Sequence, residues 1–397
     1  MNNTTMISLP EDQCTGCGAC YKICPKNAIS MESADDGHLY PKIDEKRCIR
    51  CKRCMQSCHA LQSPEKRVPS ACYAARLKND KVLKKSTSGG MFYALAHEIL
   101  SENGVVYACV YDSGYHAYIE RITSEEDFAA VYGSKYVWSS AWQSYEKVKE
   151  DLNLGKKVLY TALPCQISGL LKYLGKTEEK LFTVDVLCGG APSPYAFERY
   201  IDTLTDEKGR SDLRFQFRDK DPNGCGVHCT YYVNGKKHHE NYLENSFYFS
   251  FCSKSRVTWR VSCYSCDYKS IRRVSDMTIG DYWGVEKYHP SFQPKDGVSV
   301  VMVNTQKGNE LFDRIKNSLV FEESELLNVI PKNSLVQTEE EGHHPIPDYR
   351  NDFFDILRTQ GWKAADKKFL QTPTRKNLLR NQNKFYRKIK HILGKKG

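Results

Sequence analysis

Residues 14–24 read Cys-Thr-Gly-Cys-Gly-Ala-Cys-Tyr-Lys-Ile-Cys, and residues 48–58 read Cys-Ile-Arg-Cys-Lys-Arg-Cys-Met-Gln-Ser-Cys. Both runs have the spacing C-x2-C-x2-C-x3-C, and an offset of 34 residues separates them, which indicates a duplicated unit. They hold eight of the 17 cysteines in the chain. In a small secreted protein so many cysteines would suggest disulfides, but no signal-peptide pattern precedes these runs. Metal ligation is therefore the better explanation.

This spacing is typical of bacterial ferredoxins with two 4Fe-4S clusters, in which three close thiolates bind one cluster and the fourth reaches the other. We expect one cluster on Cys14, Cys17, Cys20 and Cys58. We expect a second on Cys48, Cys51, Cys54 and Cys24. Gly16 and Gly18 suit a backbone that wraps closely around inorganic sulfur. The alternative is a pair of four-cysteine zinc sites, which usually take two cysteines from each of two separated loops.

The two runs differ in the residues around their cysteines. Pro25 follows Cys24, whereas His59 follows Cys58 at a position where ferredoxins of this type have proline. A basic rim accompanies the second run and consists of Arg47, Arg50, Lys52 and Arg53. Such a rim could raise the potential of that cluster or dock an acidic redox partner. The alternative is a charged face that only meets water.

Length and charge limit the class of protein. A chain of 397 residues has room for a small module and a core of roughly 250 to 300 residues. No run approaches the ~20 consecutive apolar residues of a membrane-spanning helix, and the first residues lack an apolar segment after a charged one. We therefore expect a soluble, cytoplasmic protein. The formal net charge is +10, but thiolates around each cluster would make the assembled protein less basic.

The pattern changes after a polar linker at 62–69. Strand-like runs at 71–77, 105–111, 158–161 and 181–187 alternate with helix-like runs, which predicts an α/β domain. Beyond about residue 205 the pattern becomes short and β-rich, with runs at 213–218, 228–233 and 298–304. We therefore expect an α+β protein: a bacterial-type 2[4Fe-4S] ferredoxin fold, then an α/β domain with a β-rich C-terminal part. The predicted boundaries are 1–66, 67–360 and 361–397.

Two further features could bind cofactors. Residues 86–100, STSGGMFYALAHEIL, place Ser88, Gly89 and Gly90 just before a helix, whose free N–H groups can hold a phosphate. The alternative is a capped helix start without a ligand.

Another four cysteines, Cys165, Cys188, Cys263 and Cys266, also stand out. The first two follow strands at a sheet edge where ligands collect, and the others form a C-x2-C pair. Together they could close a third 4Fe-4S site, or they could be small buried side chains.

From residue 71 to about 354 the chain resembles the beta-subunit family of coenzyme F420 hydrogenases and dehydrogenases. The motifs that carry this resemblance are STSGGMF at 86–92, YGSKYVWSS at 132–140, LPCQISGL at 163–170, VDVLCGGAPSPYAFERYI at 184–201, FRDKD at 217–221 and SCYSCDYKSIRRVSDMTIGDYWGV at 262–285. The resemblance implies FAD near Ser88, Gly89, Gly90 and Lys135. It also implies a third cluster on Cys165, Cys188, Cys263 and Cys266.

The chain departs from the family pattern near the implied cofactors. Ala162 and Leu163 stand where Gly-Thr is usual, Gly189 replaces a common His, and Cys225 stands where the family tends to have Trp. These departures leave open a substrate other than the deazaflavin that gives the family its name.

The resemblance implies an FAD and iron-sulfur oxidoreductase, because a flavin can join one-electron clusters to a two-electron substrate. Lys135 could act catalytically by stabilising negative charge on the reduced flavin, or it could be a surface lysine. The substrate would be coenzyme F420 or another organic molecule, such as a sugar or polysaccharide precursor. The alternative is an electron-transfer protein or accessory reductase of a surface-polysaccharide pathway without deazaflavin activity. We expect as partners a ferredoxin or oxidoreductase subunit and a small-molecule electron acceptor, and no nucleic acid.

From Arg375 onward the chain has nine Lys or Arg residues and no Asp or Glu, with apolar residues at helical spacing. Such a basic amphipathic tail could contact an anionic membrane surface or an acidic partner. The alternative is a terminal helix that packs on its own domain.

Overall fold

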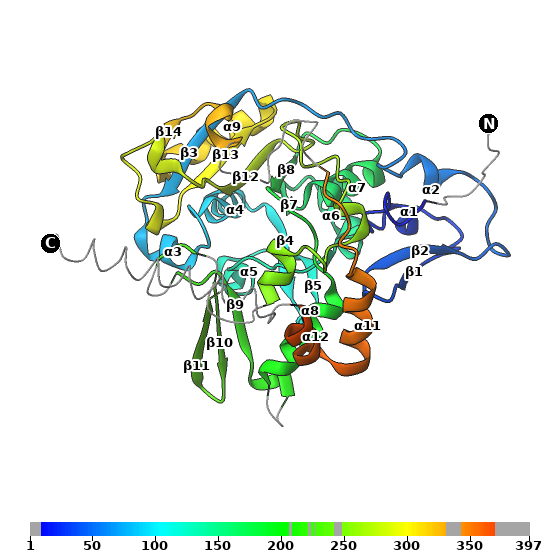
Figure 1. Ribbon diagram of the computed structural model, residues 1–397. Helices are drawn as coiled ribbons and strands as arrows, with labels where there is room; N and C mark the ends of the chain where they lie inside the picture. The colour runs from blue at the N-terminus through cyan, green and yellow to red at the C-terminus, as the bar shows by residue number, and fades with distance from the viewer. Residues whose placement is uncertain are drawn as a thin grey trace.

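The computed structural model describes residues 9–205, 209–220, 224–226, 228–241, 248–330 and 343–369. Its largest sheet has nine strands (Figure 1). Their order across the sheet is β14 (Leu319–Glu323), β3 (Ala71–Leu77), β13 (Ser299–Val303), β12 (Met277–Asp281), β8 (Leu181–Val186), β7 (Val158–Ala162), β4 (Val105–Tyr111), β5 (Ala117–Ile122) and β6 (Ser139–Ser140).

The middle of this sheet is parallel. Strands β12, β8, β7 and β4 pair in parallel, whereas β13, β3 and β14 on one side and β5 on the other add antiparallel pairs. All five residues of β7 and all five of β13 are buried. Strands buried on both faces read as continuous apolar runs, which is why VLYTA and SVVMV form the interior.

Helices cover both faces of the sheet. On one face, α4 (Met91–Ser101) and α9 (Gln306–Ile315) contribute Leu95 and Phe312 to a core that also includes Val106 of β4. On the other face, α6 (Tyr145–Asn153) and α7 (Pro164–Leu174) contribute to a core that includes Tyr107 of β4. Because successive side chains of a strand point to opposite faces, Val106 and Tyr107 belong to different cores.

The N-terminal part is a small unit beside α7 (Figure 1). It contains α1 (Ala19–Lys22), the antiparallel hairpin β1 (Ile29–Ser33) and β2 (Leu39–Ile43), and α2 (Arg53–Gln56). The linker after it is fixed to the body, because Arg67 and Arg273 exchange two backbone hydrogen bonds of 2.8 Å.

A second sheet lies below the main one in Figure 1 and consists of β9 (Arg214–Phe217), β10 (His228–Val233) and β11 (Lys236–Asn241). Aromatic side chains join it to α8 (Pro194–Leu204), α11 (Arg350–Gln360) and α12 (Trp362–Phe369). The remaining described helices of more than three residues are α3 (Asp80–Lys85), α5 (Phe128–Val131) and α10 (Leu326–Val329), together with a 3₁₀ helix at Gly209–Asp212 and a π-helical turn at Ser250–Lys254.

The predicted mixed α/β architecture with a ferredoxin-like N-terminal part is confirmed. The β-rich C-terminal part divides between two sheets, because the run at 298–304 enters the main sheet as β13 whereas the runs at 213–218 and 228–233 form β9 and β10 of the second sheet. The boundary at 361 also falls inside packed structure, since Trp362 and Ala365 are buried. The basic tail from Arg375 lies outside the described residues. Among the residues described, no helix has the length and apolar character to cross a membrane.

Candidate functional site

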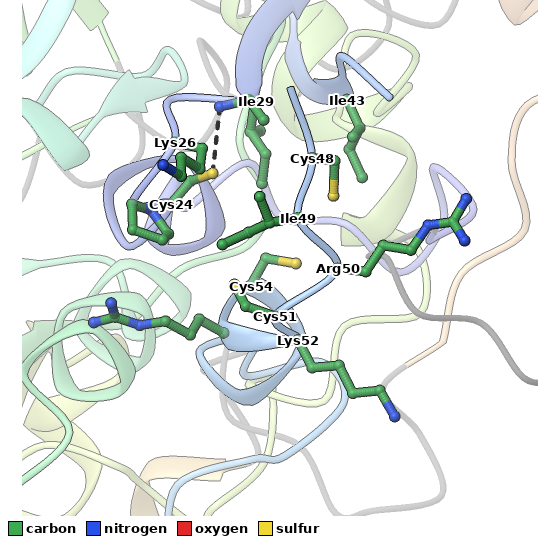
Figure 2. Close-up of a pocket in the computed structure, with 13 residues that line it drawn as sticks. Cys24, Lys26, Ile29, Ile43, Cys48, Ile49, Arg50, Cys51, Lys52 and Cys54 are labelled. Atoms are coloured by element: carbon green, nitrogen blue, oxygen red, sulfur yellow. Dashed lines mark hydrogen bonds between the residues drawn. The ribbon is translucent and has the colours of Figure 1, made fainter. Parts of the chain in front are cut away.

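The cysteines of the two runs line two hollows. Cys14, Cys17, Cys20 and Cys58 line a hollow of about 350 Å³, called here the inner hollow. Cys24, Cys48, Cys51 and Cys54 line one of about 380 Å³, called the outer hollow (Figure 2). Each short helix, α1 or α2, carries the fourth cysteine of its run away from the first three. The structure therefore brings together the two sets of thiols that the spacing predicts, in hollows of nearly equal size.

The inner hollow is covered by the body of the protein. Burial raises the pKa of the Cys17 thiol to about 12, and burial also raises that of Cys20. Thiols held together in this way suit iron, because bound metal converts thiols to thiolates and releases their protons.

Arg260 connects the body to the inner hollow. It is 1% exposed, and its Nε donates to the carbonyl oxygen of Cys14 at 2.7 Å while Nη2 donates to that of Leu39 at 3.0 Å. Its Nη1 is buried, finds no hydrogen-bond partner within the described residues, and lies beside Gly16. Buried donors are nearly always paired, so this nitrogen suits an inorganic sulfide or a thiolate of a cluster. The residues at the inner hollow thus fit a 4Fe-4S group.

The outer hollow is open to solvent. Cys51 is exposed, and the neighbouring Ile49 is 57% exposed. The backbone N–H of Ala28 donates to Cys24 Sγ at 3.3 Å, as the N–H groups around a cluster do. No group of three or more His, Cys, Asp or Glu side chains in the described residues is arranged to hold a single metal ion. The first three thiols of each run instead line a hollow shared with the fourth cysteine of the other run.

Cys165, Cys188, Cys263 and Cys266 also come together. Cys165 opens α7 after β7, Cys188 follows β8, and Cys263 ends the 3₁₀ turn Val261–Cys263. Burial, together with the charges of the neighbouring thiols, raises the pKa of Cys188 to about 12 and that of Cys263 to about 11. The backbone N–H of Ala191 donates to Cys263 Sγ at 3.3 Å. This donor set also fits a 4Fe-4S group, although the ligands remain a prediction.

Lys269 places a buried cation beside these four thiols. Its Nζ donates to the carbonyl oxygen of Cys263 at 3.0 Å and lies 4.2 Å from the ring centre of Trp259. Burial lowers the pKa of the ammonium, and the charges of three of these thiols, on Cys266, Cys263 and Cys188, oppose that shift. Sequence reasoning missed this residue, although it lies three positions after Cys266 in a quoted motif.

The inner hollow and the third group of thiols share a wall. A Cβ at Gly169 of α7 would lie 2.7 Å from Cys17 Cβ, so only glycine lets the two parts approach this closely. The hydroxyl of Tyr145 donates to the carbonyl oxygen of Cys17 at 2.9 Å and to that of Gln166, next to Cys165, at 3.2 Å. The charge of Cys17 also contributes to the raised pKa of Cys165.

His59 makes a second connection at this wall. One ring nitrogen, Nε2, lies 2.8 Å from Thr15 Oγ1, and the other, Nδ1, lies 2.8 Å from the hydroxyl of Tyr268. Burial lowers the pKa of His59 to about 4, which keeps the ring neutral. A neutral imidazole donates with one nitrogen and accepts with the other, so it can join the ferredoxin-like part to the body where proline could not.

The Ser88-Gly89-Gly90 turn makes its contacts within the protein. Ser88 Oγ donates to the carbonyl oxygen of Val298 at 3.1 Å, and Gly89 N–H donates to Ser299 Oγ at 3.0 Å. A Cβ at Gly89 would lie 2.3 Å from the carbonyl oxygen of Ala75. Gly90 adopts φ 81° as it precedes α4. These groups fasten the turn to β3 and β13, so by themselves they do not form a flavin site.

Lys135 is also engaged within the protein. Its Nζ donates to four backbone carbonyl oxygens at 2.7 to 3.2 Å, those of Ala130, Val131, Tyr132 and Gly133. The ammonium therefore caps the C-terminal end of α5, where carbonyl oxygens lack helical partners. Burial lowers its pKa to about 8, opposed by the charge of Cys109. Within the described residues, no hydrogen bond joins Lys135 to the Ser88 turn.

A charged cluster that sequence reasoning missed does reach that turn. Arg218 is 4% exposed and forms a two-bond ion pair with Asp281. Its Nη2 donates to Cys225 Sγ at 3.1 Å, and its guanidinium lies 5.2 Å from the ring centre of Trp283. The quoted motifs FRDKD and GDYWG contain Arg218, Asp281 and Trp283, but nothing in their local spacing indicates that they meet.

Lys220 fastens this cluster to the turn. Its Nζ donates to the carbonyl oxygen of Ser88 at 2.6 Å and to those of Leu83 and Asp296 at 2.8 Å. Burial lowers the pKa of its ammonium to about 8. The cluster therefore places two cations, a thiol and an aromatic ring next to the Ser88 turn.

Models of known families match three segments of the chain. A model of the 4Fe-4S dicluster domain matches residues 13–60. The N-terminal and C-terminal models of the coenzyme F420 hydrogenase/dehydrogenase beta subunit match residues 72–144 and 155–328.

Individual relatives are more distant. An uncharacterised ferredoxin of Methanocaldococcus jannaschii is 35% identical over 52 residues, which are 13% of this chain and 66% of that ferredoxin. The chain therefore spans just under two thirds of its length. Among solved structures, a chain of the F420-reducing [NiFe] hydrogenase complex from Methanosarcina barkeri, in a xenon derivative, gives a TM-score of 0.48 at 18% identity. That match covers 73% of this chain and 93% of the other.

Proposed function

Because this chain belongs to the coenzyme F420 hydrogenase/dehydrogenase beta-subunit family and carries a 4Fe-4S dicluster domain in front, we propose that it passes electrons between a redox protein and an organic two-electron substrate. Family and domain identify it as an iron-sulfur oxidoreductase. The use of FAD, the ligands of the clusters and the substrate belong to the proposal.

The observation that carries the proposal is the order of the three groups of thiols. The outer hollow opens to solvent at Cys51, three of the four cysteines at the inner hollow are buried, and the third group adjoins the inner one across Gly169. The three groups thus form a series from the surface to the edge of the main sheet. When bound, 4Fe-4S clusters carry single electrons, and a flavin exchanges single electrons for pairs.

The residues of the chain hold this series in place. Arg260 and Lys269 place buried positive charge beside the inner hollow and the third group of thiols. Such cations offset the negative charge of thiolate-bound clusters and favour the reduced state. Arg260, Tyr145 and His59 also fix the ferredoxin-like part against the body, so that the two sites keep a constant separation.

For FAD we propose a place between the Ser88 turn and the charged cluster of Arg218, Lys220 and Trp283. The proposal rests on family membership and on the partly exposed ring of Trp283 beside the guanidinium of Arg218. Ser88, Gly89, Gly90 and Lys135 are held by contacts within the protein, and so are Lys220 and Arg218, which the proposal places at the edge of the flavin site. Cations suit the pyrophosphate or the reduced ring system of a flavin. Cys225 lies in this cluster, where the family tends to have Trp, so the substrate could be coenzyme F420 or another organic acceptor.

The experiment is an anaerobic titration of the purified holoprotein. Flavin content is measured first, and the protein is then titrated with reduced coenzyme F420, with NADH and NADPH, and with a sugar-nucleotide precursor. We expect bound flavin, and bleaching of both flavin and cluster absorbance by one of these two-electron compounds. Absence of flavin from protein with full cluster content would contradict the flavin proposal. Bleaching by reduced ferredoxin alone would favour an electron-transfer protein without its own substrate.

A matched variant tests the order of the sites. In Cys188→Ser the two-electron donor should still bleach the flavin. The clusters of the ferredoxin-like part should stay oxidised, so their absorbance should not change. Cys72→Ser changes a buried cysteine that lies on β3, outside the three groups, and should behave as the parent. Equal bleaching in the parent and in Cys188→Ser would remove the third group from the route.

A further inference from the structure

The two cysteine runs share one backbone conformation but differ at two matching positions. Gly16 and Gly18 lie on either side of Cys17, with φ of 70° and 72°. Arg50 and Lys52 lie on either side of Cys51, with φ of 55° and 62°. Gly18 precedes α1 and Lys52 precedes α2 with nearly the same ψ, 7° and 2°. The duplicated unit has therefore kept a left-handed turn but replaced its glycines by basic residues.

The first run requires glycine for space as well as for backbone freedom. A Cβ at Gly16 would lie 2.9 Å from Arg260 Nη1, and a Cβ at Gly18 would lie 2.7 Å from Trp142 Cβ. These contacts arise because the body packs on the inner hollow. The second run faces away from the body, so its two positions have room for long side chains.

Long side chains in the left-handed region are unusual. A residue with a Cβ is strained there, and only Gly, Asn and Asp adopt this conformation readily. Strain of this kind clusters at functional positions, where the side chain has a use. Two strained residues on either side of an exposed cluster thiol, both basic, therefore suggest a function for their charge.

The basic side chains surround the open hollow. Arg47, Arg50, Lys52 and Arg53 are exposed, and Figure 2 shows Arg50 and Lys52 pointing away from the hollow that the thiols line. Across the part of the chain that the structure describes, no ion pair involves Arg50, Lys52 or Arg53. Arg47 donates to the carbonyl oxygen of Lys26 at 3.2 Å, which adds order to the rim. The nearest acidic residues in sequence are Asp44 and Glu45, on the turn after β2.

We propose that this rim, with Ile49 inside it, is the docking surface for an acidic one-electron carrier protein of the ferredoxin type. The inference deepens the proposed function, on which it rests, by placing the redox partner at the outer hollow. Complementary charge steers association and makes it sensitive to salt. Ile49, at 57% exposure, supplies an apolar centre within a polar rim, which is the usual anatomy of an interface.

The test measures binding by calorimetry, with the full-length holoprotein and an oxidised acidic two-cluster ferredoxin as the probe. We expect an affinity that falls steeply between about 0.05 and about 0.5 M salt, because screening weakens exposed charges. The double variant Arg50→Asn/Lys52→Asn removes both charges and introduces asparagine, which tolerates the left-handed turn. It should raise the Kd about tenfold at low salt and flatten the salt dependence. Its melting temperature should equal or exceed that of the parent, because strain is relieved.

The matched control removes the same charge elsewhere. Lys81 and Lys84 are exposed on α3, which lies on the side of the molecule opposite the ferredoxin-like part (Figure 1). Lys81→Gln/Lys84→Gln should bind the ferredoxin as the parent does. An unchanged Kd in the Asn variant, or an equal loss in the α3 variant, would overturn the proposal. A lower melting temperature in the Asn variant would overturn the argument from strain.

The readouts separate this inference from the proposed function. Binding of an oxidised carrier needs neither a substrate nor turnover. A protein that binds the ferredoxin with the expected salt dependence but bleaches with no two-electron compound would support the docking surface and contradict the proposed reaction. A protein that a two-electron compound bleaches as proposed, but that does not bind the ferredoxin, would support the proposed reaction and contradict the docking surface.

Discussion

Four backbone carbonyl oxygens at the end of α5 surround the ammonium of Lys135. Burial lowers the pKa of this ammonium from 10.5 to about 8. A lysine with a lowered pKa in the folded state makes the protein more stable as pH rises from about 8 to 10.5, because the unfolded chain then binds more protons. We expect the free energy of unfolding of the parent, relative to Lys135→Met, to rise by about 2 kcal/mol across this range. Urea unfolding at several pH values measures it.

The titration of a neighbour needs a control. Cys109 faces the same ammonium, and burial raises the pKa of its thiol, so the comparison is repeated with Cys109→Ala in both proteins. Parallel stability curves for parent and Lys135→Met would contradict the structural role. A normal stability curve together with slower flavin reduction in Lys135→Met would return the residue to the catalytic role that the resemblance implies.

Among single residues, the sequence predicted which cysteine thiols come together but not which buried arginines lie beside them. Cysteine spacing brings the first three sulfur atoms of each run together, because the chain between them is short, and the repeat of the motif indicates that the fourth reaches the other site. Arg260 meets Cys14, and Arg218 meets Asp281, only after the chain has folded through more than sixty intervening positions. Local pattern holds no signal for such pairs. A buried arginine is recognisable only once its surroundings are known.

Helix starts show how the fold selects residues at the scale of an element. Gly18 precedes α1 at φ 72°, and a Cβ there would meet Trp142 at 2.7 Å. Gly175 ends α7 at the same φ of 72°, but a Cβ there would have no neighbour within 4 Å. Gly175→Ala should therefore cost about 1 kcal/mol, from backbone strain alone. Gly18→Ala should cost about 3 kcal/mol, since it adds a steric clash.

Thermal unfolding and iron content of the two glycine variants distinguish these costs. We expect Gly175→Ala to retain all its iron, and Gly18→Ala to lose part of it as the ferredoxin-like part moves off α6 and the turn before it. Equal destabilisation by both substitutions would show that the Trp142 side chain moves to make room for the added methyl group. The body would then not be closely packed against the inner hollow.

The strands were predictable where both faces are buried, as at 105–111 and 158–161, because continuous apolar runs have few other uses. The mixed order of the sheet was not. Strand β13 lies between β12 and β3, although more than two hundred residues separate it from β3. Pairing over such a distance depends on packing of the whole domain and leaves no local pattern.

For the whole molecule, rigid attachment of the ferredoxin-like part is what makes three neighbouring sites useful. Arg350 of α11 contacts Asp36 at 2.5 Å, and His38 Nδ1 lies 2.9 Å from the same carboxylate. Burial alone would raise the pKa of Asp36, but its contacts with His38 and the charge of Arg350 hold it well below its usual range. A charged pair buried in this way stays intact above the acid range. The separation between the inner hollow and the third group is therefore fixed.

The most direct test of three cluster sites in series is iron and sulfide analysis combined with low-temperature EPR of the fully reduced protein. The account predicts about twelve irons per chain and a spectrum broadened by magnetic interaction between neighbouring clusters. In Cys165→Ser/Cys263→Ser it predicts about eight irons and the spectrum of a two-cluster ferredoxin. About eight irons in the parent, with a spectrum that the double substitution leaves unchanged, would contradict the account.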